Sequence, residues 1–220
     1  MSRPHDTEES GTTNEAHPLF AALYGPLGFC IERSWMGERR PRLLKGARGA
    51  VLEIGGGTGA NLPHYRDVDR LTIAEPDPSM RKRLGPKLEA ARVPVEVSAA
   101  GAENLPFHDG SFDTVVSTLV LCTVPDQESA LREISRVLRP GGRLLFIEHV
   151  RATGAAARWQ DRIEPVWERI FGGCHPNRDT VAAIEEAGFE IESFESFYPP
   201  VPLSGLIPHV QGSATVRLAA

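Results

Sequence analysis

The sequence has no long apolar run, few cysteines and no excess of basic residues. No stretch of eighteen continuous apolar residues occurs, so no stable membrane span is predicted. Cys30, Cys122 and Cys174 are scattered, which excludes a disulfide framework and a metal-ligand spacing and predicts a cytoplasmic location. The 24 basic side chains against 29 acidic ones give a formal charge of −5, so no partner nucleic acid is expected.

The remaining composition describes one globular domain. A chain of 220 residues with 41% hydrophobic content suits a single α/β domain with a sizeable core. Residues 1–17 are polar and lack the apolar core of a signal peptide, so we expect a disordered tail there and one domain over 18–220. Aromatic and apolar side chains between Pro18 and Trp35, interrupted by Gly25-Pro26, predict two short helices.

Short apolar runs alternate with amphipathic stretches from residue 50 onward. The runs predict strands at 50–54, 71–75, 93–98, 112–117, 143–148, 189–197 and 209–216. Helices are expected from Pro78, after the cap Asp126, across 155–175, where Pro165 starts or kinks one piece, and near 179–187. This order predicts a mostly parallel seven-stranded sheet with helices on both faces. Ligands bind such sheets at the carboxyl ends of the strands.

A glycine-rich turn follows the first predicted strand in the stretch Val51-Leu52-Glu53-Ile54-Gly55-Gly56-Gly57-Thr58-Gly59. Glycines allow positive φ and close approach of a ligand, and the next helix points free N–H groups at the loop. Gly55-x-Gly57-x-x-Ala60 formally fits a dinucleotide fingerprint, with Glu75 twenty residues later. However, Glu53 places negative charge where a pyrophosphate would lie. A cofactor with a free ammonium group would instead favour that carboxylate.

Glu53-x-Gly55-x-Gly57-x-Gly59 resembles motif I of class I S-adenosylmethionine (SAM) methyltransferases. The resemblance implies a Rossmann-like fold with SAM as cofactor, a loop that wraps its methionine part, and Glu75 on both ribose hydroxyls. A carboxylate suits that last task because it accepts two hydrogen bonds at once.

Two later stretches, Gly101–Phe107 and Leu138-Arg139-Pro140-Gly141-Gly142, resemble the adenine-side loop and the signature turn of ubiquinone-type methyltransferases. Many relatives carry Asp where this chain has Gly101, so the adenine contact is expected from the backbone at Gly101 and Ala102. The residues that the resemblance places at the cofactor are Glu53, Gly55, Gly56, Gly57, Gly59, Asn61, Glu75, Pro76, Met80, Gly101, Ala102, Glu103, Thr118 and Leu119.

A narrower resemblance concerns the acceptor. Thr118–Val124, Glu148-His149-Val150, Glu164-Pro165-x-Trp167, Gly173-Cys174 and Pro208-His209-Val210-x-Gly212 are similar to the thiol S-methyltransferases of the methyltransferase-like seven family. This implies a small-molecule acceptor, preferably a thiol. The animal enzymes begin with a hydrophobic membrane anchor, which this sequence lacks. Alternatives are a phospholipid N-methyltransferase, a quinone C-methyltransferase and a SAM-binding protein without turnover. The oligomeric state stays open.

The acceptor side is expected beneath a helical lid, 18–46, and a cap helix within 155–175. His149 is the predicted proton acceptor, although it equally fits a residue that orients a loop. Cys122 and Cys174 belong to the substrate side, although each also fits a small buried apolar residue, and no metal is predicted at Cys174-His175. The side chains expected to line the pocket are Phe20, Tyr24, Trp35, Cys122, Trp167 and Cys174. The cluster Arg39, Arg40 and Arg42 is predicted to be a solvated face.

Overall fold

The computed structural model describes residues 35–200 and 204–217. The predicted tail over 1–17, the two short helices predicted before Trp35, and the pocket candidates Phe20 and Tyr24 lie outside the described residues. The statements below concern the described part of the chain.

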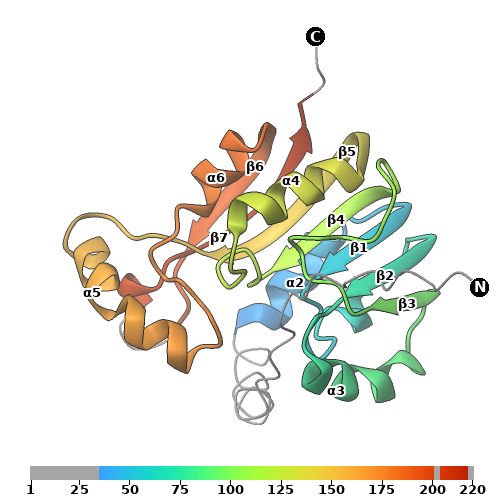
Figure 1. Ribbon diagram of the computed structural model, residues 1–220, viewed down its shortest axis with the longest axis horizontal. Coiled ribbons are helices and arrows are strands. Elements are labelled where there is room, and N and C mark those ends of the chain that lie inside the picture. The colour runs from blue at the N-terminus through green and yellow to red at the C-terminus, as the bar shows by residue number, and fades with distance from the viewer. Residues whose placement is uncertain (1–34, 201–203, 218–220) are drawn as a thin grey trace, which may run out of the picture.

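Seven strands form one sheet in the order β3-β2-β1-β4-β5-β7-β6 (Figure 1). The first five strands in the chain run parallel to one another, whereas β7 is antiparallel to both β5 and β6. The mostly parallel sheet is thereby confirmed. Strand β7 follows β6 after eleven residues, fewer than the dozen or more that a parallel crossover requires. The strands are β1 Ala50–Ile54, β2 Arg70–Ala74, β3 Val95–Ser98, β4 Phe112–Thr118, β5 Leu138–His149, β6 Phe189–Phe197 and β7 His209–Val216.

Helices cover both faces of the sheet, as predicted. The helices are α2 Gly37–Leu44, α3 Pro78–Leu88, α4 Gln127–Val137, α5 Gly154–Ile170 and α6 Thr180–Glu186, with short 3-10 helices at Leu62–His64 and Ser204–Leu206. Leu52 of β1 belongs to the core layer that contains Ile134 of α4, whereas Val51 belongs to the layer that contains Leu84 of α3. Successive strand side chains point to opposite faces, so β1 contributes to both layers.

Local sequence explains where several elements begin. The Asp126 carboxylate accepts the Ser129 N–H at 3.0 Å and caps α4, as predicted. Three strands, β1, β6 and β7, have the predicted bounds. Strand β3 begins at Val95 rather than at residue 93, after Pro94, which has no N–H to donate. Strand β5 begins at Leu138 rather than at residue 143, with a register shift opposite Phe112 and Thr114.

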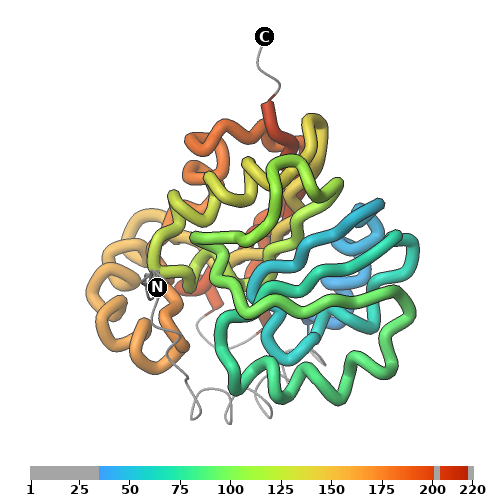
Figure 2. The backbone as a smooth tube through the Cα atoms, turned by 45° about the vertical axis from the view of Figure 1, so that its right-hand side comes forward, coloured from blue at the N-terminus to red at the C-terminus, as the bar shows by residue number. Residues whose placement is uncertain are grey.

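Helix α5 lies beyond the end of the sheet, away from the two layers (Figures 1 and 2). It is a single helix, Gly154–Ile170, with Pro165 in its interior, so no new piece begins at that proline. The buried Gln160 side chain attaches the helix to the sheet end. Its oxygen accepts the Ala152 N–H at 2.7 Å, and its nitrogen donates to the carbonyls of Leu206 and Val150. In the described ranges, no helix combines the length and the apolar character that a bilayer span requires.

Candidate active site

The glycine loop after β1 forms the floor of the candidate site. Gly55 and Gly57 both have φ near +55°, a conformation that side chains other than glycine adopt only with strain. A Cβ on Gly55 would lie 2.5 Å from the Val120 side chain, whereas around Gly57 only a carbonyl oxygen at 3.9 Å approaches that position. Gly55 is therefore required for packing. The backbone at Gly57 is open to a ligand.

Glu75, directly after β2, is bonded to that loop. Its Oε2 accepts the Gly57 N–H at 2.7 Å, and its Oε1 accepts the Asp77 N–H at 2.8 Å. Burial raises the pKa of Glu75, and the two backbone N–H donors oppose that effect. Pro76, which is half-buried, precedes α3, and Met80, which is buried, lies within it. The carboxylate has lone pairs left over for the two hydroxyls of a ribose.

Asn61 connects three elements beneath the loop. Its Nδ2 donates to Glu53 Oε1 and to Thr118 Oγ1, each at 3.1 Å, and its Oδ1 accepts from Arg40 Nη1 at 2.8 Å. Tyr65 Oη donates to Glu53 Oε2 at 2.8 Å. The ends of β1 and β4 and the helix α2 are thus joined by one buried hydrogen-bond network. Such a network fixes the loop geometry before any ligand binds.

Glu53 is an unusual acid at the centre of this network. Burial raises the pKa of Glu53 to about 7, and the bond from Tyr65 and the charge of Arg40 oppose the increase. The site can therefore hold Glu53 neutral when empty and ionised beside a cationic group. This suits the ammonium group that the sequence led us to expect.

The solvated face predicted for the arginine cluster is wrong at Arg40. Arg40 is only 4% exposed, whereas Arg42 is exposed. Arg39 is half-buried, with its guanidinium 3.4 Å from the Phe197 ring centroid and an ion pair to Glu195. The spacing could have revealed Arg40, because it lies four residues after Met36 and three before Leu43, on the inward stripe of α2. No local signal marked Tyr65.

The predicted adenine side contains a half-buried acid, Glu103, with one buried oxygen that lacks a partner. Glu103 Oε1 is buried and accepts no hydrogen bond. A Cβ on Gly101 would lie 3.0 Å from Glu103 Oε2, and Ala102 between them is buried. A buried acceptor that no protein group satisfies is costly unless a ligand supplies the donor. Glu103 can therefore accept from an amine such as that of adenine.

Leu119, which follows β4, has φ +59° and is the single non-glycine residue with positive φ in the described ranges. Its N–H donates to the Ile147 carbonyl at 2.8 Å, which continues the β4–β5 pairing by one residue. Holding leucine in this conformation costs about 1–2 kcal/mol. Strain of this kind persists where surrounding contacts enforce it, commonly at functional sites.

The contacts that enforce the Leu119 conformation come from Glu148, whose role the sequence did not reveal. The buried carboxylate accepts from Ser117 Oγ at 2.6 Å and from the N–H groups of Val120 and Cys122, each at 3.2 Å. Burial raises the pKa of Glu148, and these donors oppose the increase. The only sequence signal is an acid that directly follows the apolar run of β5. Glu148 holds the segment after β4 against the end of β5.

His149 ends β5 and is 4% exposed. Its Nδ1 lies 3.5 Å from Cys174 Sγ, and its Nε2 is buried without a hydrogen-bond partner. The ring stacks on His209, with centroids 5.1 Å apart, and lies 6.0 Å from the Trp167 ring. Burial lowers the pKa of His209 to about 3, so that imidazole is neutral at physiological pH.

Further rings complete an aromatic cluster that consists of Trp35, His149, Trp167, Phe197 and His209. Trp35 lies 5.0 Å from His209 and 5.5 Å from Phe197, as measured between ring centroids. The structure thus brings the predicted Trp35, Trp167 and His149 into one cluster. Phe197 and His209 were not predicted as site residues, and they reach it through the pairing of β6 with β7.

Buried polar atoms without a hydrogen-bond partner lie at the predicted adenine side and in the aromatic cluster. In the described part of the chain, four buried side-chain nitrogen or oxygen atoms lack a hydrogen-bond partner. Three are ring nitrogens of the aromatic cluster, in Trp35, His149 and Trp167, and the fourth belongs to Glu103. Buried polar groups are normally satisfied, so this distribution marks two places where a ligand would complete the bonding.

The cysteines of the predicted substrate side lie together. Cys122 Sγ and Cys174 Sγ are 3.9 Å apart, and both side chains are buried. His175, next in sequence to Cys174, bonds elsewhere, with its Nδ1 2.7 Å from Glu164 Oε1. Ligand atoms of Glu164, Glu168 and His175 lie within 4.8 Å of one another, and Cys174 does not belong to that group.

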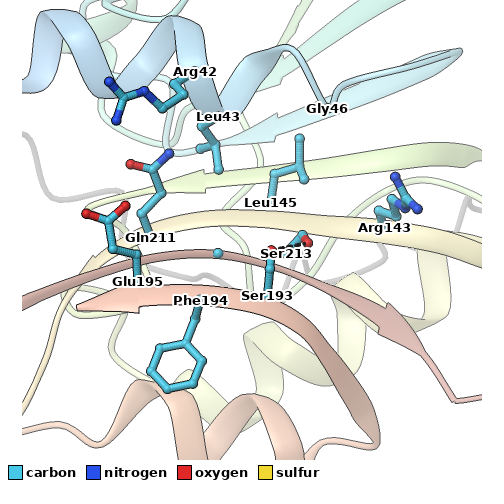
Figure 3. A pocket seen from close by; sticks show the side chains of 11 residues that line it. Arg42, Leu43, Gly46, Arg143, Leu145, Ser193, Phe194, Glu195, Gln211 and Ser213 are labelled. Atoms are coloured by element: carbon cyan, nitrogen blue, oxygen red, sulfur yellow. Dashed lines mark hydrogen bonds between the residues drawn. The ribbon is translucent and has the colours of Figure 1, made fainter. Parts of the chain in front are cut away.

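A separate groove of about 360 Å³ lies between α2 and the strands β5, β7 and β6 (Figure 3). Arg42 and Gln211 approach it from opposite sides, and Phe194 points away to the other face of the sheet. None of the predicted site residues that the structure describes lines this groove. A smaller cleft does contain such residues, and its lining is Arg40, Glu53, Gly55, Gly56, Gly57, Thr58, Ala60, Asn61 and Thr118.

Several known proteins are similar to this chain in sequence and in fold. A methyltransferase domain model matches residues 52–146. Human thiol S-methyltransferase TMT1A is 39% identical over 170 residues, which are 75% of this chain and 70% of that protein. The ubiquinone/menaquinone biosynthesis C-methyltransferase UbiE of Escherichia fergusonii is 34% identical over 193 residues, which are 74% of this chain and 75% of that protein.

A solved structure shows the same fold with a cofactor product. Geranyl diphosphate C-methyltransferase from Streptomyces coelicolor A3(2), in complex with S-adenosyl-L-homocysteine, superposes with a TM-score of 0.68 at 16% identity, over 82% of this chain and 78% of that one. The open glycine loop and the unpartnered Glu103 oxygen fit such a cofactor. The cofactor is SAM, and the chain belongs to the class I SAM-dependent methyltransferases, the family that includes the TMT1 thiol S-methyltransferases.

Proposed function

We propose that this methyltransferase transfers the methyl group of SAM to the sulfur of a small apolar thiol. The observation that carries the proposal is the buried, unpartnered Nε2 of His149 within an aromatic cluster at the carboxyl end of β5. The relatives add support, because two human proteins that are 39% and 40% identical to this chain are thiol S-methyltransferases.

SAM supplies a methyl group that its sulfonium already activates for displacement. In our proposal the glycine loop, Asn61 and Glu53 hold its methionine end, and Glu75 holds the ribose between the loop and α3. Glu103 and the backbone at Gly101 and Ala102 take the adenine, with Pro76 and Met80 beside it. Thr118 and Leu119 line the side from which the methyl leaves. The protein's main tasks are then to align the acceptor and to exclude water.

A thiol reacts as its thiolate, so removal of the thiol proton accelerates the transfer. His149 Nε2 can accept that proton when Nδ1 carries the ring hydrogen. The contact between Nδ1 and Cys174 Sγ favours this tautomer, because the hydrogen bond between the two cysteines and the nearby His149 lower the pKa of Cys174, and a Cys174 thiolate can only accept. In this arrangement Cys174 positions His149 and does not itself react with the methyl group.

A C-methyltransferase acting on a quinol is the second candidate. It is supported by the 34% identity to UbiE and by an aromatic cluster that would also hold a ring. A test uses one apolar carbon skeleton that carries a thiol, an alcohol or an amine, together with a quinol, at equal concentrations with methyl-labelled SAM. We expect label on the thiol and not on its alcohol or amine analogues. Label on the quinol alone would reject the S-methylation proposal.

A further inference from the structure

Two thiols face each other beneath the aromatic cluster. Cys122 Sγ lies 3.9 Å from Cys174 Sγ, and both cysteines are free. The backbone holds them there. The His175 N–H donates to the Cys122 carbonyl at 2.8 Å, and the Cys122 N–H donates to Glu148 Oε2 at 3.2 Å. The two cysteines are therefore brought together where the segment after β4 meets the segment after α5.

The two thiols are not equivalent. Cys174 is 9% exposed and Cys122 is 1% exposed, so a small molecule reaches Cys174 first. Cys174 also has the ring nitrogen His149 Nδ1 at 3.5 Å, whereas Cys122 meets the backbone of His149. The hydrogen bond between the two thiols and the nearby imidazole lower the pKa of Cys174, whereas the same bond and burial raise the pKa of Cys122. One reactive thiolate beside one protonated thiol is the arrangement of an attacking and a resolving cysteine.

We propose that Cys174 and Cys122 form a thiol–disulfide exchange centre that reacts with small-molecule disulfides. The Cys174 thiolate attacks one sulfur of a disulfide RSSR, which forms a mixed disulfide and releases RS⁻. Cys122 then loses its proton and attacks the Cys174 sulfur, which releases the second RS⁻ and forms the Cys122–Cys174 disulfide. The disulfide RSSR is reduced by two electrons to two thiols, and the cysteine pair is oxidised by two electrons. The Cys122 proton passes to one released thiolate, and the other takes from solvent the equivalent of the proton that Cys174 lost when it ionised.

Oxidation of the pair would also change the methyltransferase site. A disulfide needs the sulfur atoms about 2 Å apart, so Cys174 would move toward Cys122 and its contact with His149 Nδ1 would change. If His149 takes the proton of the thiol that is methylated, oxidation of the cysteine pair slows methyl transfer and leaves the SAM site intact. This consequence rests on the proposed function, whereas the exchange reaction does not.

The test uses the full chain with Cys30→Ser, which leaves Cys122 and Cys174 as its two thiols. Native protein is treated with bis(2-hydroxyethyl) disulfide and followed by intact mass and by a thiol count after denaturation. We expect a loss of about 2 Da and of both thiols, reversed by dithiothreitol. With Cys122→Ser added, the protein should keep one mixed disulfide. With Cys174→Ser added instead, modification should be at least ~10-fold slower.

Persistence of both free thiols in the Cys30→Ser protein would overturn the proposal, as would equal modification rates for the two single-cysteine proteins. Peptide mapping of oxidised wild-type protein is the second measurement and needs no variant to fold. A Cys122–Cys174 disulfide supports the proposal. If every disulfide found includes Cys30, the proposal is contradicted. All of these readouts are masses and thiol counts, so a failure to methylate thiols would reject the proposed function and leave the exchange result unaffected.

Discussion

The amide nitrogen of Gly57 lies 2.7 Å from Oε2 of Glu75, so the acid after β2 is bonded to the glycine loop that follows β1. The pairing of β1 with β2 in parallel makes this contact possible, because it brings the carboxyl ends of both strands to the same edge. The glycine loop, which would hold the methionine part of SAM, is thus already bonded to Glu75, which would hold the ribose.

Glu75→Ala should weaken SAM binding by about 1.5–3 kcal/mol, because the charged acceptor for the ribose hydroxyls is lost. Isothermal titration calorimetry measures the effect directly. Glu89→Ala is the matched control, since it removes an exposed acid at the end of α3 and should leave the affinity unchanged. Wild-type affinity in Glu75→Ala would remove Glu75 from the cofactor site.

Arg40→Ala should lower the free energy of unfolding by about 2–3 kcal/mol, because it leaves the buried Asn61 oxygen without its 2.8 Å donor. Arg42→Ala, on the exposed side of the same helix, should change it by no more than about 0.5 kcal/mol. Urea denaturation of the two variants measures the difference. Equal effects would mean that Arg40 does not support the site from within the core.

Glu53 should make stability depend on pH. Its pKa is about 7 in the folded protein against 4.5 as the ordinary value, so between these values the folded chain keeps a proton that the unfolded chain has released. The free energy of unfolding of the wild type should therefore fall, relative to Glu53→Gln, by about 3 kcal/mol as pH rises from 4.5 to 7. Denaturation curves across this range provide the measurement. A difference that is constant or rises with pH would contradict the burial of a neutral Glu53.

His149→Ala should reduce kcat for thiol methylation by about 100-fold or more, because the proton acceptor is lost, while the Kd of SAM stays near the wild-type value. The pH profile separates this role from a structural one. If His149 takes the proton, the variant's rate should rise with pH as the free thiol ionises by itself. Normal turnover in the variant would exclude proton transfer to His149.

Motif and periodicity predicted the sheet, the glycine loop and Glu75, because strand patterns and turn residues are local in sequence. The aromatic cluster could be predicted only in part. Trp35 and Trp167 belong to recognisable aromatic stretches, whereas Phe197 and His209 reach the site through the pairing of β6 and β7, which no local pattern specifies. Arg40 was misread because a basic run normally faces solvent, and its acceptor, Asn61, lies 21 residues away in the sequence.

Thiol methylation is tested most directly by turnover of methyl-labelled SAM by the purified protein against thiols, quinols and phosphatidylethanolamine vesicles in one panel. We predict label on the apolar thiols. Label on quinol or lipid alone would contradict the proposed acceptor. SAM that stays bound and unconverted with every acceptor would contradict the assignment as a thiol methyltransferase.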